Sequence, residues 1–219
     1  VSFGLNNSNP TLDNLQKSGL KVLLNGDWNE QSPLGKAEWI KFFGALYGMD
    51  AKAKTIFSSI EKEYHTTLAL AKKAPYKPTV LSGAMYQDQW FVPQGESWMA
   101  LFLKESQSNY LWANTEGTGS LTLPFETILE KAQKAEFWIA PGDFSSIKEM
   151  NNSNPHYAKF EAFKNKKVYS YALHKGAKGG ILFFEWSATR PDWVLKDLIA
   201  IFHPELLPNH RPYFFEKLN

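Results

Sequence analysis

Apolar residues recur every three or four positions between residues 34 and 73, which is the spacing of one face of a helix. Ser32 suits an N-cap and Pro33 suits the first helical position, so a helix is predicted to start here. Residues 48–50 interrupt the pattern, with Asp50 placed as a second N-cap. The second half carries one apolar stripe: Ala53, Ile56, Ile60, Tyr64 and Leu68. At about 1.5 Å per residue, this half forms a rod of roughly 35 Å.

A helix of this length has two interpretations. Because α/β-like sequence lies on both sides of it, it is either a strut that joins two lobes or a surface helix that lies along one core. The pattern alone does not choose between the two.

The residues before the long helix read as the end of a strand, a turn, a helix and a second strand. The helix starts within residues 9–13 and ends at Gly19. The apolar run 20–24 is predicted to be a short buried strand. Since such a strand needs neighbours in a sheet, it either joins the strands that come later or belongs to a lobe that this chain lacks.

From residue 79 onward, short apolar runs alternate with helical patterns. The predicted strands are 79–83, 90–92, 137–140 and 168–171. The predicted helices are 97–103, 124–134, 156–163 and 192–202. This alternation is typical of an α/β fold. We expect a three-layer lobe with a mainly parallel sheet, joined to the long helix.

Composition excludes several classes of function. The net charge is +2 and only two residues are arginines, so the chain has no nucleic-acid-binding footprint. No apolar run approaches the roughly 18 residues of a membrane span. The chain has no cysteine, which excludes disulfides and a cysteine nucleophile. Aromatic residues make up 15%, with 8 tryptophans, and they suit either a large core or a site for flat organic ligands.

The motifs of common enzymes and metal sites are not found in the sequence. The five histidines show no HExxH spacing, and no G-x-S-x-G segment marks a nucleophile. Gly176, Gly179 and Gly180 lack the spacing of a dinucleotide or phosphate loop. Glu126 and Glu130 lie one helical turn apart, for which a solvated helix face is the favoured interpretation. We therefore expect no catalytic residue, no metal site and no cofactor.

Aromatic residues instead follow the predicted strands. They are Tyr86, Trp90, Phe144 and the stretch 171–174. Trp28 precedes the long helix. In open α/β sheets, the loops at the carboxyl ends of the strands form the ligand crevice. Core packing is the alternative for each residue taken singly, but the agreement of several loops favours a binding site.

Several stretches carry a resemblance to a known family. They are WNEQSPLGKAEWIK at 28–41, KPTVL at 77–81 with GESW at 95–98, and the segments 125–139 and 190–208. In order and spacing they resemble the substrate-binding proteins of ABC importers. The similar class has a rigid helix between two lobes and binds ferric siderophores, haem or vitamin B12. The last segment resembles the closing helix of the iron-transport branch common in Bacteroidetes.

The resemblance implies a division of the chain. Residues 1–33 are then the remnant of an N-terminal α/β lobe, 34–74 the interlobe helix and 75–219 the C-terminal α/β lobe. Most of the N-terminal lobe is then missing. The resemblance also implies a periplasmic protein without enzymatic activity, anchored to the membrane as a lipoprotein in its full-length form.

The resemblance also implies which residues meet the ligand and the permease. The loop that contains Trp90 matches a ligand-facing loop, with Trp90 as a stacking residue, and the loop that contains Thr118 matches a second one. Glu126 matches the carboxylate that docks onto a permease arginine, although a carboxylate in the first helical turn is favourable in any case. The implied ligand-binding residues are Trp28, Tyr86, Trp90, Thr118, Phe144, Tyr171, His174 and Lys175.

The implied partners are a small-molecule ligand (ferric siderophore, haem or cobalamin) and an ABC permease, with no nucleic acid. The sequence does not select among these ligands. One alternative is an interaction module that binds a protein through exposed aromatic residues, and self-association through the exposed cleft face is also left open. A less favoured alternative is an enzyme on a similar scaffold. A nitrogenase-like metallocluster protein shares the architecture but needs cysteine ligands, which this chain lacks.

Overall fold

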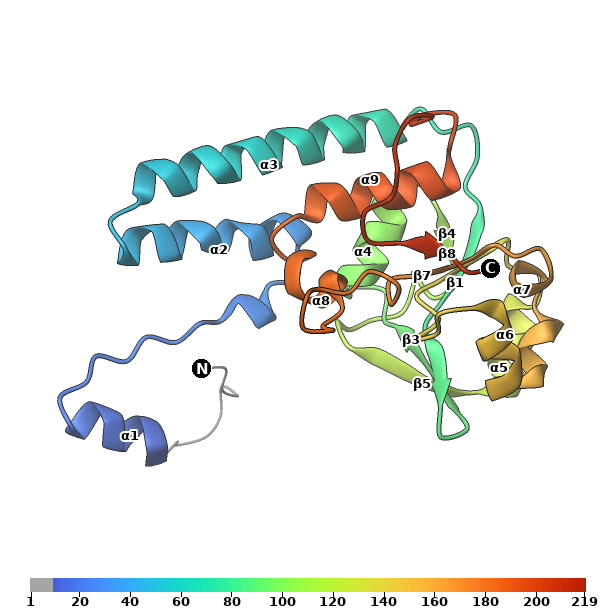
Figure 1. Ribbon diagram of the computed structural model, residues 1–219, viewed down its shortest axis with the longest axis horizontal. Helices are drawn as coiled ribbons and strands as arrows, with labels where there is room; N and C mark the ends of the chain where they lie inside the picture. Colours follow the sequence, from blue (N-terminus) through green and yellow to red (C-terminus); the bar gives the residue numbers. More distant parts are fainter. Residues whose placement is uncertain (1–9) are drawn as a thin grey trace. The chain divides into compact units, whose positions relative to one another are not determined.

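The computed structural model describes residues 10–219, apart from the side chain of Trp28 (Figure 1). The chain divides into two compact units, residues 1–30 and 31–219. The strand end expected before residue 9 lies outside the described residues. No helix in the described part of the chain has both the length and the apolar character needed to cross a membrane.

The N-terminal unit contains helix α1 (Pro10–Lys17) and the short 3-10 helix η1 (Asp27–Asn29). Gly19, with a φ of +79°, follows α1 as predicted. The prediction of a buried strand at 20–24 is wrong. These residues pair with no described strand, and their three leucines are each more than half exposed. An apolar run becomes a strand only where a neighbouring strand can pair with its backbone, and the described chain offers none here.

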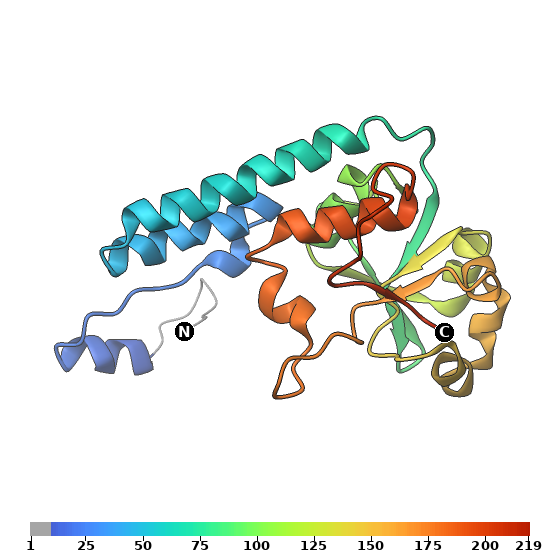
Figure 2. The same ribbon diagram turned by 45° about the horizontal axis from the view of Figure 1, so that its top comes forward.

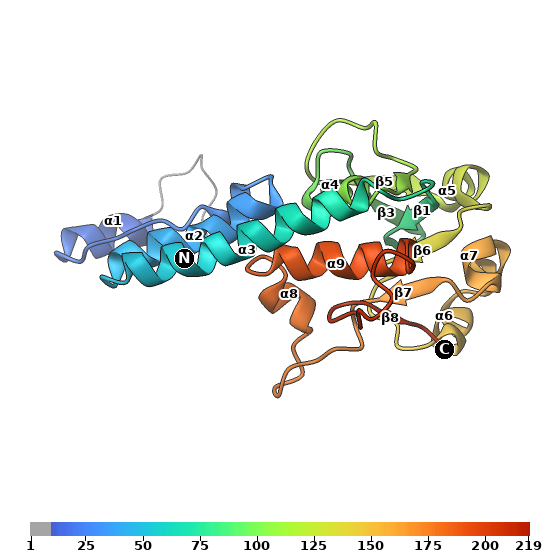
Figure 3. The same cartoon turned by 90° about the horizontal axis from the view of Figure 1, so that it is seen from above.

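The long periodic stretch forms two helices, α2 (Pro33–Leu46) and α3 (Asp50–Ala71), that lie antiparallel and side by side (Figures 1 and 3). The chain reverses at Gly48, whose φ is +66°. The Ser32 N-cap is confirmed, because its Oγ accepts a hydrogen bond from the backbone N–H of Gly35 at 3.0 Å.

The second predicted cap is corrected by one position. Met49 occupies the N-cap of α3, and no side chain caps this helix end. Asp50 is instead the first helical residue, where its carboxylate is favourable to the helix dipole.

Among the described residues, five strands form the central sheet in the order β4-β1-β6-β7-β8. Their bounds are β4 Asn109–Tyr110, β1 Thr79–Ser82, β6 Phe137–Ile139, β7 Val168–Ser170 and β8 Glu216–Lys217. The first four run parallel and β8 pairs antiparallel with β7, so the predicted mainly parallel sheet is confirmed. A smaller antiparallel sheet contains β2 (Ala84–Tyr86), β3 (Gln89–Pro93) and β5 (Ser120–Pro124).

Helices cover both faces of the central sheet, which gives the expected three layers (Figures 2 and 3). Helices α4 (Trp98–Glu105) and α9 (Pro191–Phe202) lie on one face. On the other face lie α5 (Phe125–Ala132), α6 (Ile147–Ser153) and α7 (Glu161–Lys164). The predicted helix 156–163 is instead the 3-10 helix η2 (Pro155–Lys159) followed by α7, and α8 (Leu182–Trp186) was not predicted.

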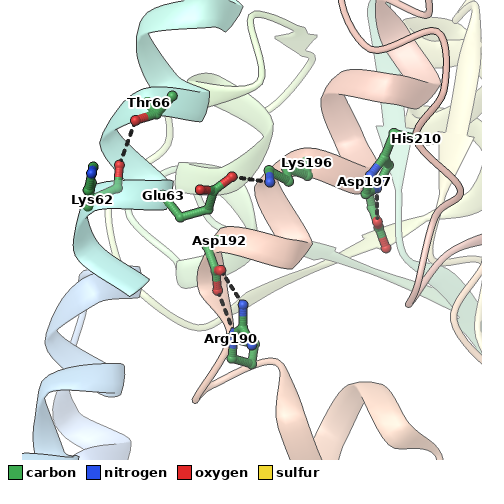
Figure 4. A network of polar contacts seen from close by, with 8 residues as sticks. All are labelled: Lys62, Glu63, Thr66, Arg190, Asp192, Lys196, Asp197 and His210. Atoms are coloured by element: carbon green, nitrogen blue, oxygen red, sulfur yellow. Dashed lines mark hydrogen bonds and ion pairs between the residues drawn. The ribbon is translucent and has the colours of Figure 1, made fainter. Parts of the chain in front are cut away.

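Two polar contacts fasten α3 to the helices beneath it. Glu63 of α3 forms an ion pair with Lys196 of α9, as Figure 4 shows. Tyr64, which is buried on the apolar stripe, donates a hydrogen bond from its hydroxyl group to the carboxylate of Glu105 at the end of α4. Burial raises the pKa of Glu105, because the carboxylate is partly removed from water. Both contacts are made by neighbouring residues, so they hold one turn of α3 against the sheet-covering helices.

A fully buried carboxylate on α9 organises the C-terminal segment. Asp197 accepts hydrogen bonds from the backbone N–H groups of Tyr213 at 2.9 Å and Phe214 at 2.6 Å. Its other oxygen lies 2.7 Å from Nε2 of His210 (Figure 4). These three partners satisfy the carboxylate inside the protein and fix the segment that leads into β8.

We expect Asp197→Ala to lower the free energy of unfolding by about 3 kcal/mol, because it leaves the buried N–H of Phe214 and the partly buried donors of Tyr213 and His210 without their acceptor. Urea denaturation followed by tryptophan fluorescence measures the change. Asp50→Ala, which removes an exposed carboxylate, serves as the control and is expected to cost less than about 1 kcal/mol. Equal losses in the two variants would contradict the assignment.

Candidate ligand-binding site

The four parallel strands end at one edge of the central sheet, here named the carboxyl edge. The segments that leave it are 111–119 after β4, 83–88 after β1, 140–146 after β6 and 171–181 after β7. Ligands of open α/β sheets bind outside the carboxyl ends of the strands. Six of the expected ligand-binding residues lie in these segments: Tyr86, Thr118, Phe144, Tyr171, His174 and Lys175.

Two buried tryptophans hold the end of β1 at this edge. The rings of Trp90 and Trp138 are fully buried, with centroids 5.0 Å apart. The indole N–H of Trp90 donates to the carbonyl of Ser82 at 3.3 Å, and that of Trp138 donates to the carbonyl of Gly83 at 2.9 Å. Trp90 is therefore a core residue, contrary to the expectation that it stacks on a ligand. Its ring is enclosed by other aromatic side chains.

Gly83 allows the chain to leave β1 and enter the β2–β3 hairpin. Its φ is +88°, a conformation that other residues rarely adopt. A Cβ atom at this position would lie 1.9 Å from the carbonyl oxygen of Phe91. Position 83 thus requires glycine both for its backbone conformation and for the close approach of β3.

Contacts between the loops after β6 and β7 fix their positions. Ser170 Oγ donates a hydrogen bond to the carbonyl of Gly142 at 3.4 Å and accepts one from the N–H of Ala172 at 3.0 Å. The ring of Phe144 is partly buried and lies 6.1 Å from that of Tyr157. These loops are therefore held by protein contacts of their own.

Tyr171 combines an aromatic face with a neutral phenol. Its ring stacks on Phe183 at 4.9 Å with an interplanar angle of 13°, and meets the edge of Phe184 at 5.1 Å. Burial raises the pKa of the Tyr171 phenol, and the nearby Asp143 carboxylate raises it further. The phenol is therefore protonated at neutral pH and can donate a hydrogen bond.

His174 and Lys175 follow in the same segment. Nε2 of His174 lies 3.3 Å from a carboxylate oxygen of Glu216 in β8. The carbonyl of His174 accepts a hydrogen bond from the N–H of Leu182 at 2.9 Å, so this segment folds back to the start of α8. The side chain of Lys175 is exposed. Glu216 was not predicted as part of the site.

The loop that carries Thr118 is tethered to the start of α4. The N–H of Gly117 donates to the carboxylate of Glu96, and the N–H of Gly119 donates to the side-chain oxygen of Gln94, both at 2.9 Å. Thr118 lies between these two anchors and is exposed. Its backbone position is thus fixed while its side chain faces solvent.

Tyr86 is 65% exposed beside the turn of the β2–β3 hairpin. The two turn residues, Gln87 and Asp88, have φ values of +48° and +62°, as expected for a tight two-residue hairpin. Trp28 lies in η1 of the N-terminal unit, whereas the carboxyl edge belongs to the other unit.

Glu126, the expected docking residue, is exposed in the first turn of α5. No hydrogen bond or ion pair within the described residues engages its carboxylate. It borders a surface pocket of about 490 Å³ that is also lined by Asp88, Phe125, His156 and Lys159. The lining of the pocket includes side chains of both charges and several apolar side chains.

Helix α8 adds two exposed rings that the sequence analysis overlooked. Phe184 is 64% exposed and Trp186 is 44% exposed, whereas Phe183 between Leu182 and Phe184 is buried. The sequence signal was the run 181–186, which follows Gly180 and contains more apolar residues than a surface loop usually does. In the described part of the chain, no three His, Asp or Glu side chains are grouped to hold a metal ion.

The family described as periplasmic binding protein matches residues 4–172 of the chain. Two similar curated proteins come from Methanocaldococcus jannaschii. The uncharacterized lipoprotein MJ0878 is 29% identical over 204 residues, which are 92% of this chain and 47% of that protein. The uncharacterized protein MJ0642 is 27% identical over 205 residues, 92% of this chain and 59% of that protein. The chain thus spans about half the length of the curated relatives it matches.

Several solved structures share the fold. A possible iron-binding periplasmic solute-binding protein from Staphylococcus epidermidis superposes with a TM-score of 0.65 and 17% identity, covering 89% of this chain and 70% of that one. A periplasmic heme binding protein from Pseudomonas aeruginosa superposes with a TM-score of 0.67 and 14% identity, covering 97% of this chain and 74% of that one. Helicobacter pylori CeuE with Ni(II) bound superposes with a TM-score of 0.65 and 17% identity, covering 93% of this chain and 61% of that one. At these identities the likeness concerns the fold alone.

We expect Gly83→Ala to lower the free energy of unfolding by about 3–5 kcal/mol, because backbone strain and a clash with β3 add together. Gly48→Ala is the matched control. Gly48 also has a positive φ, but no atom lies within 4 Å of an added Cβ. The control is expected to lose only about 1–2 kcal/mol from backbone strain. Urea denaturation of both variants tests this, and equal losses would show that the approach of Phe91 has no effect.

Proposed function

We propose a solute-binding role for this chain, which belongs to the periplasmic binding protein family. The observation that carries the proposal is the carboxyl edge. Four parallel strands end there together, and six residues that the sequence singled out lie in the segments that leave these strands. We infer that the ligand contacts this edge through Tyr86, Thr118, Phe144, Tyr171, His174 and Lys175.

The edge is suited to binding with little rearrangement. The end of β1 is fixed by two indole N–H groups, and the Thr118 loop by the side chains of Gln94 and Glu96. Since these loops are already ordered, little conformational entropy is lost when a ligand arrives. Ligand sites are commonly preformed in this way, with aromatic walls and few polar groups.

We propose that the ligand is an iron chelate, haem or cobalamin. Support comes from the sequence resemblance and from similarly folded proteins, which are described as iron-binding in one case and as heme-binding in another. The exposed rings of Tyr86 and Phe184 fit a ligand with a large organic surface.

We further propose that the chain delivers its ligand to an ABC permease. The free carboxylate of Glu126 suits a docking contact with a permease arginine, because an unpaired carboxylate can form a bidentate pair. Residues 34–74 would join the C-terminal lobe, 75–219, to an N-terminal lobe of which 1–33 is part. The attachment of α3 through Glu63 and Tyr64 supports a rigid connection.

The proposed location is the periplasm or its equivalent outside the cytoplasmic membrane, with a lipid anchor in the full-length form. The relative MJ0878 is named as a lipoprotein, which supports this location. No catalytic step is part of the proposal.

A second candidate is a module that binds a protein. It is favoured by an apolar hollow of about 200 Å³ near the reversal between α2 and α3. The hollow is lined by Ile40, Phe43, Tyr47, Met49 and Ile56, among others. Several of these side chains are substantially exposed.

A tryptophan-fluorescence titration of this chain with haemin, a ferric siderophore and cobalamin tests the proposal. We expect saturable quenching by one class. Tyr86→Ala is expected to raise Kd about 10-fold, since loss of an aromatic contact costs roughly 1–2 kcal/mol. Tyr76→Ala is the control, because Tyr76 is 49% exposed and precedes β1 at the opposite end of the strand. No response to any of the three classes would favour the protein-binding module.

Glu126→Ala is expected to leave ligand affinity unchanged and to reduce transport in a reconstituted importer. The reason is that the carboxylate contacts the permease and not the ligand. Glu130→Ala removes a carboxylate one turn further along α5 and serves as the control, with transport retained. A parallel loss of binding and transport in Glu126→Ala would rule out the docking role.

A further inference from the structure

Asp88 belongs both to the β2–β3 hairpin and to the pocket beside Glu126. It is the second residue of the hairpin turn, and Tyr86 is the last residue of β2 before that turn. Asp88 also lines the pocket of about 490 Å³ at the start of α5, here named the α5 pocket. Tyr86, an expected ligand contact, is therefore two positions away from a residue that shares a pocket with the expected docking carboxylate.

The strand register extends this connection across the small sheet. Tyr86 pairs with Gln89 in the hairpin, and Gln89 pairs with Pro124 of β5. Pro124 is the N-cap of α5. Met85, Gln89 and Pro124 all line the α5 pocket. The backbone thus leads in one line across three strands from Tyr86 to the helix that carries Glu126.

The hairpin is held at its base and free at its turn. Met85 pairs with Trp90, whose ring is fully buried, and Sδ of Met85 lies 3.9 Å from Nδ2 of Asn154. The four residues beyond this pair, 86–89, are all exposed. Pro124 has no N–H, so it donates no hydrogen bond to β3 at this end. The turn can therefore pivot about the pair of Met85 and Trp90.

The turn adopts a conformation that its sequence disfavours. Both central residues, Gln87 and Asp88, have positive φ values. Turns of this kind usually contain Asn-Gly or Asp-Gly, because these residues tolerate the left-handed region. A glutamine tolerates it poorly. Since residues in disfavoured conformations cluster where proteins bind or switch, this turn is suited to rearrangement.

The α5 pocket offers two carboxylates to a cation. Within the described residues, no hydrogen bond or ion pair engages the carboxylate of Asp88 or of Glu126. Phe125 also lines the pocket. Because a guanidinium pairs with carboxylates and stacks on aromatic rings, this lining suits an arginine side chain better than a lysine. The ammonium of Lys159 is part of the lining too, so a lone cation is held only weakly.

We propose that an arginine of the permease, held in the α5 pocket by Asp88 together with Glu126, draws the β2–β3 turn toward α5 and loosens the contact of Tyr86 with the bound ligand. The loops after β4 and β6 have anchors of their own, which join Gly117 to Glu96 and Gly142 to Ser170, so they do not follow the turn. The movement of Tyr86 then changes the shape of the site, and ligand affinity falls. This inference rests on the proposed function and adds to it how docking is communicated to the ligand.

The first test asks whether the α5 pocket binds a guanidinium. Argininamide is titrated into the chain labelled with ¹³C-methyl methionine. We expect a saturable shift of the Met85 methyl signal and none for Met49, which lines the hollow between α2 and α3. Lysinamide, which carries the same charge, is expected to bind roughly 3-fold more weakly, because an ammonium lacks the planar fork of donors.

Three variants assign the binding to the two carboxylates. Asp88→Asn and Glu126→Gln are each expected to weaken argininamide binding by about 5-fold, as for the loss of one exposed ion pair. Asparagine tolerates positive φ, so Asp88→Asn removes the charge and keeps the turn. Glu130→Gln is the matched control, because Glu130 is an exposed carboxylate on α5 that does not line the pocket, and it should bind as the unmodified chain does.

The second test asks whether the turn moves. The chain is labelled with 3-fluorotyrosine, and the ¹⁹F signal of Tyr86 is assigned by its loss in Tyr86→Phe. We expect saturating argininamide to shift this signal in the unmodified chain and to leave it in place in Asp88→Asn, where the remaining contact with Glu126 does not reach the turn. The signal of Tyr76, which precedes β1, is the internal control and should not shift.

The third test links the turn to the ligand. Among haemin, a ferric siderophore and cobalamin, the compound that quenches tryptophan fluorescence is titrated again with saturating argininamide. Its Kd is expected to rise about 3-fold, and the bound compound must then weaken argininamide binding by the same factor, because coupling between two sites is reciprocal. In Asp88→Asn, argininamide is expected to leave this Kd unchanged.

The outcomes separate the inference from the proposed function. The inference is overturned if argininamide shifts neither signal, if it shifts Met85 without Tyr86, or if Asp88→Asn responds as the unmodified chain does. It is also overturned if Tyr86 moves while the Kd of the quenching compound stays the same. In each of these cases, quenching by one compound leaves the proposed function standing. If none of the three compounds binds while Met85 and Tyr86 both respond, the proposed function fails and the link between pocket and turn stands.

Discussion

The arrangement of this molecule depends on how the carbonyl groups of Ser82 and Gly83 are satisfied. The chain leaves the central sheet at this point. These carbonyl groups therefore need hydrogen-bond donors from outside the neighbouring strands, although they remain close to the core. A buried carbonyl without a donor costs free energy comparable to a lost hydrogen bond. The indole N–H groups of Trp90 and Trp138 supply the donors. Because β1 lies between β4 and β6, the position of its end determines where the neighbouring loops emerge.

A second buried interaction links the far end of the chain to the same edge. Asp197 holds the backbone of Tyr213 and Phe214, and β8 begins two residues later. The fixed segment leads directly into β8, where Glu216 pairs with Ser170 of β7. The buried carboxylate of Asp197 on α9 therefore helps to position the exposed carboxylate of Glu216, although the two side chains do not touch.

The parts of the fold that local pattern determines were predictable. The strands at 79–83, 137–140 and 168–171 and the helix at 192–202 follow from apolar runs and periodicity, and alternation gave the parallel sheet. Trp90 shows where this reasoning stops. Its place beside an expected loop suggested a ligand contact, whereas β3 buries alternate residues and turns this ring inward. The strand prediction for residues 20–24 was wrong for a related reason, since the composition of a segment does not tell whether a partner strand is present. The pair of His174 and Glu216 depends on the antiparallel return of β8, and two residues of strand leave almost no signal in a sequence.

The attachment of α3 has a mechanical consequence. Its 22 residues span about 33 Å, but Glu63 and Tyr64 tie it to α9 and α4 in its second half, while its first half packs on α2. The hairpin of α2 and α3 is thus a lever whose pivot lies about two-thirds of the way along α3 from the reversal. About 20 Å of α3 lies between Asp50 and these contacts, so a displacement of about 3 Å at the reversal corresponds to a tilt of about 9°. Small rotations at the pivot therefore move the tip by several ångströms, and the packing of α2 and α3 against α9 and α4, together with the two polar contacts, limits how far the tip can swing.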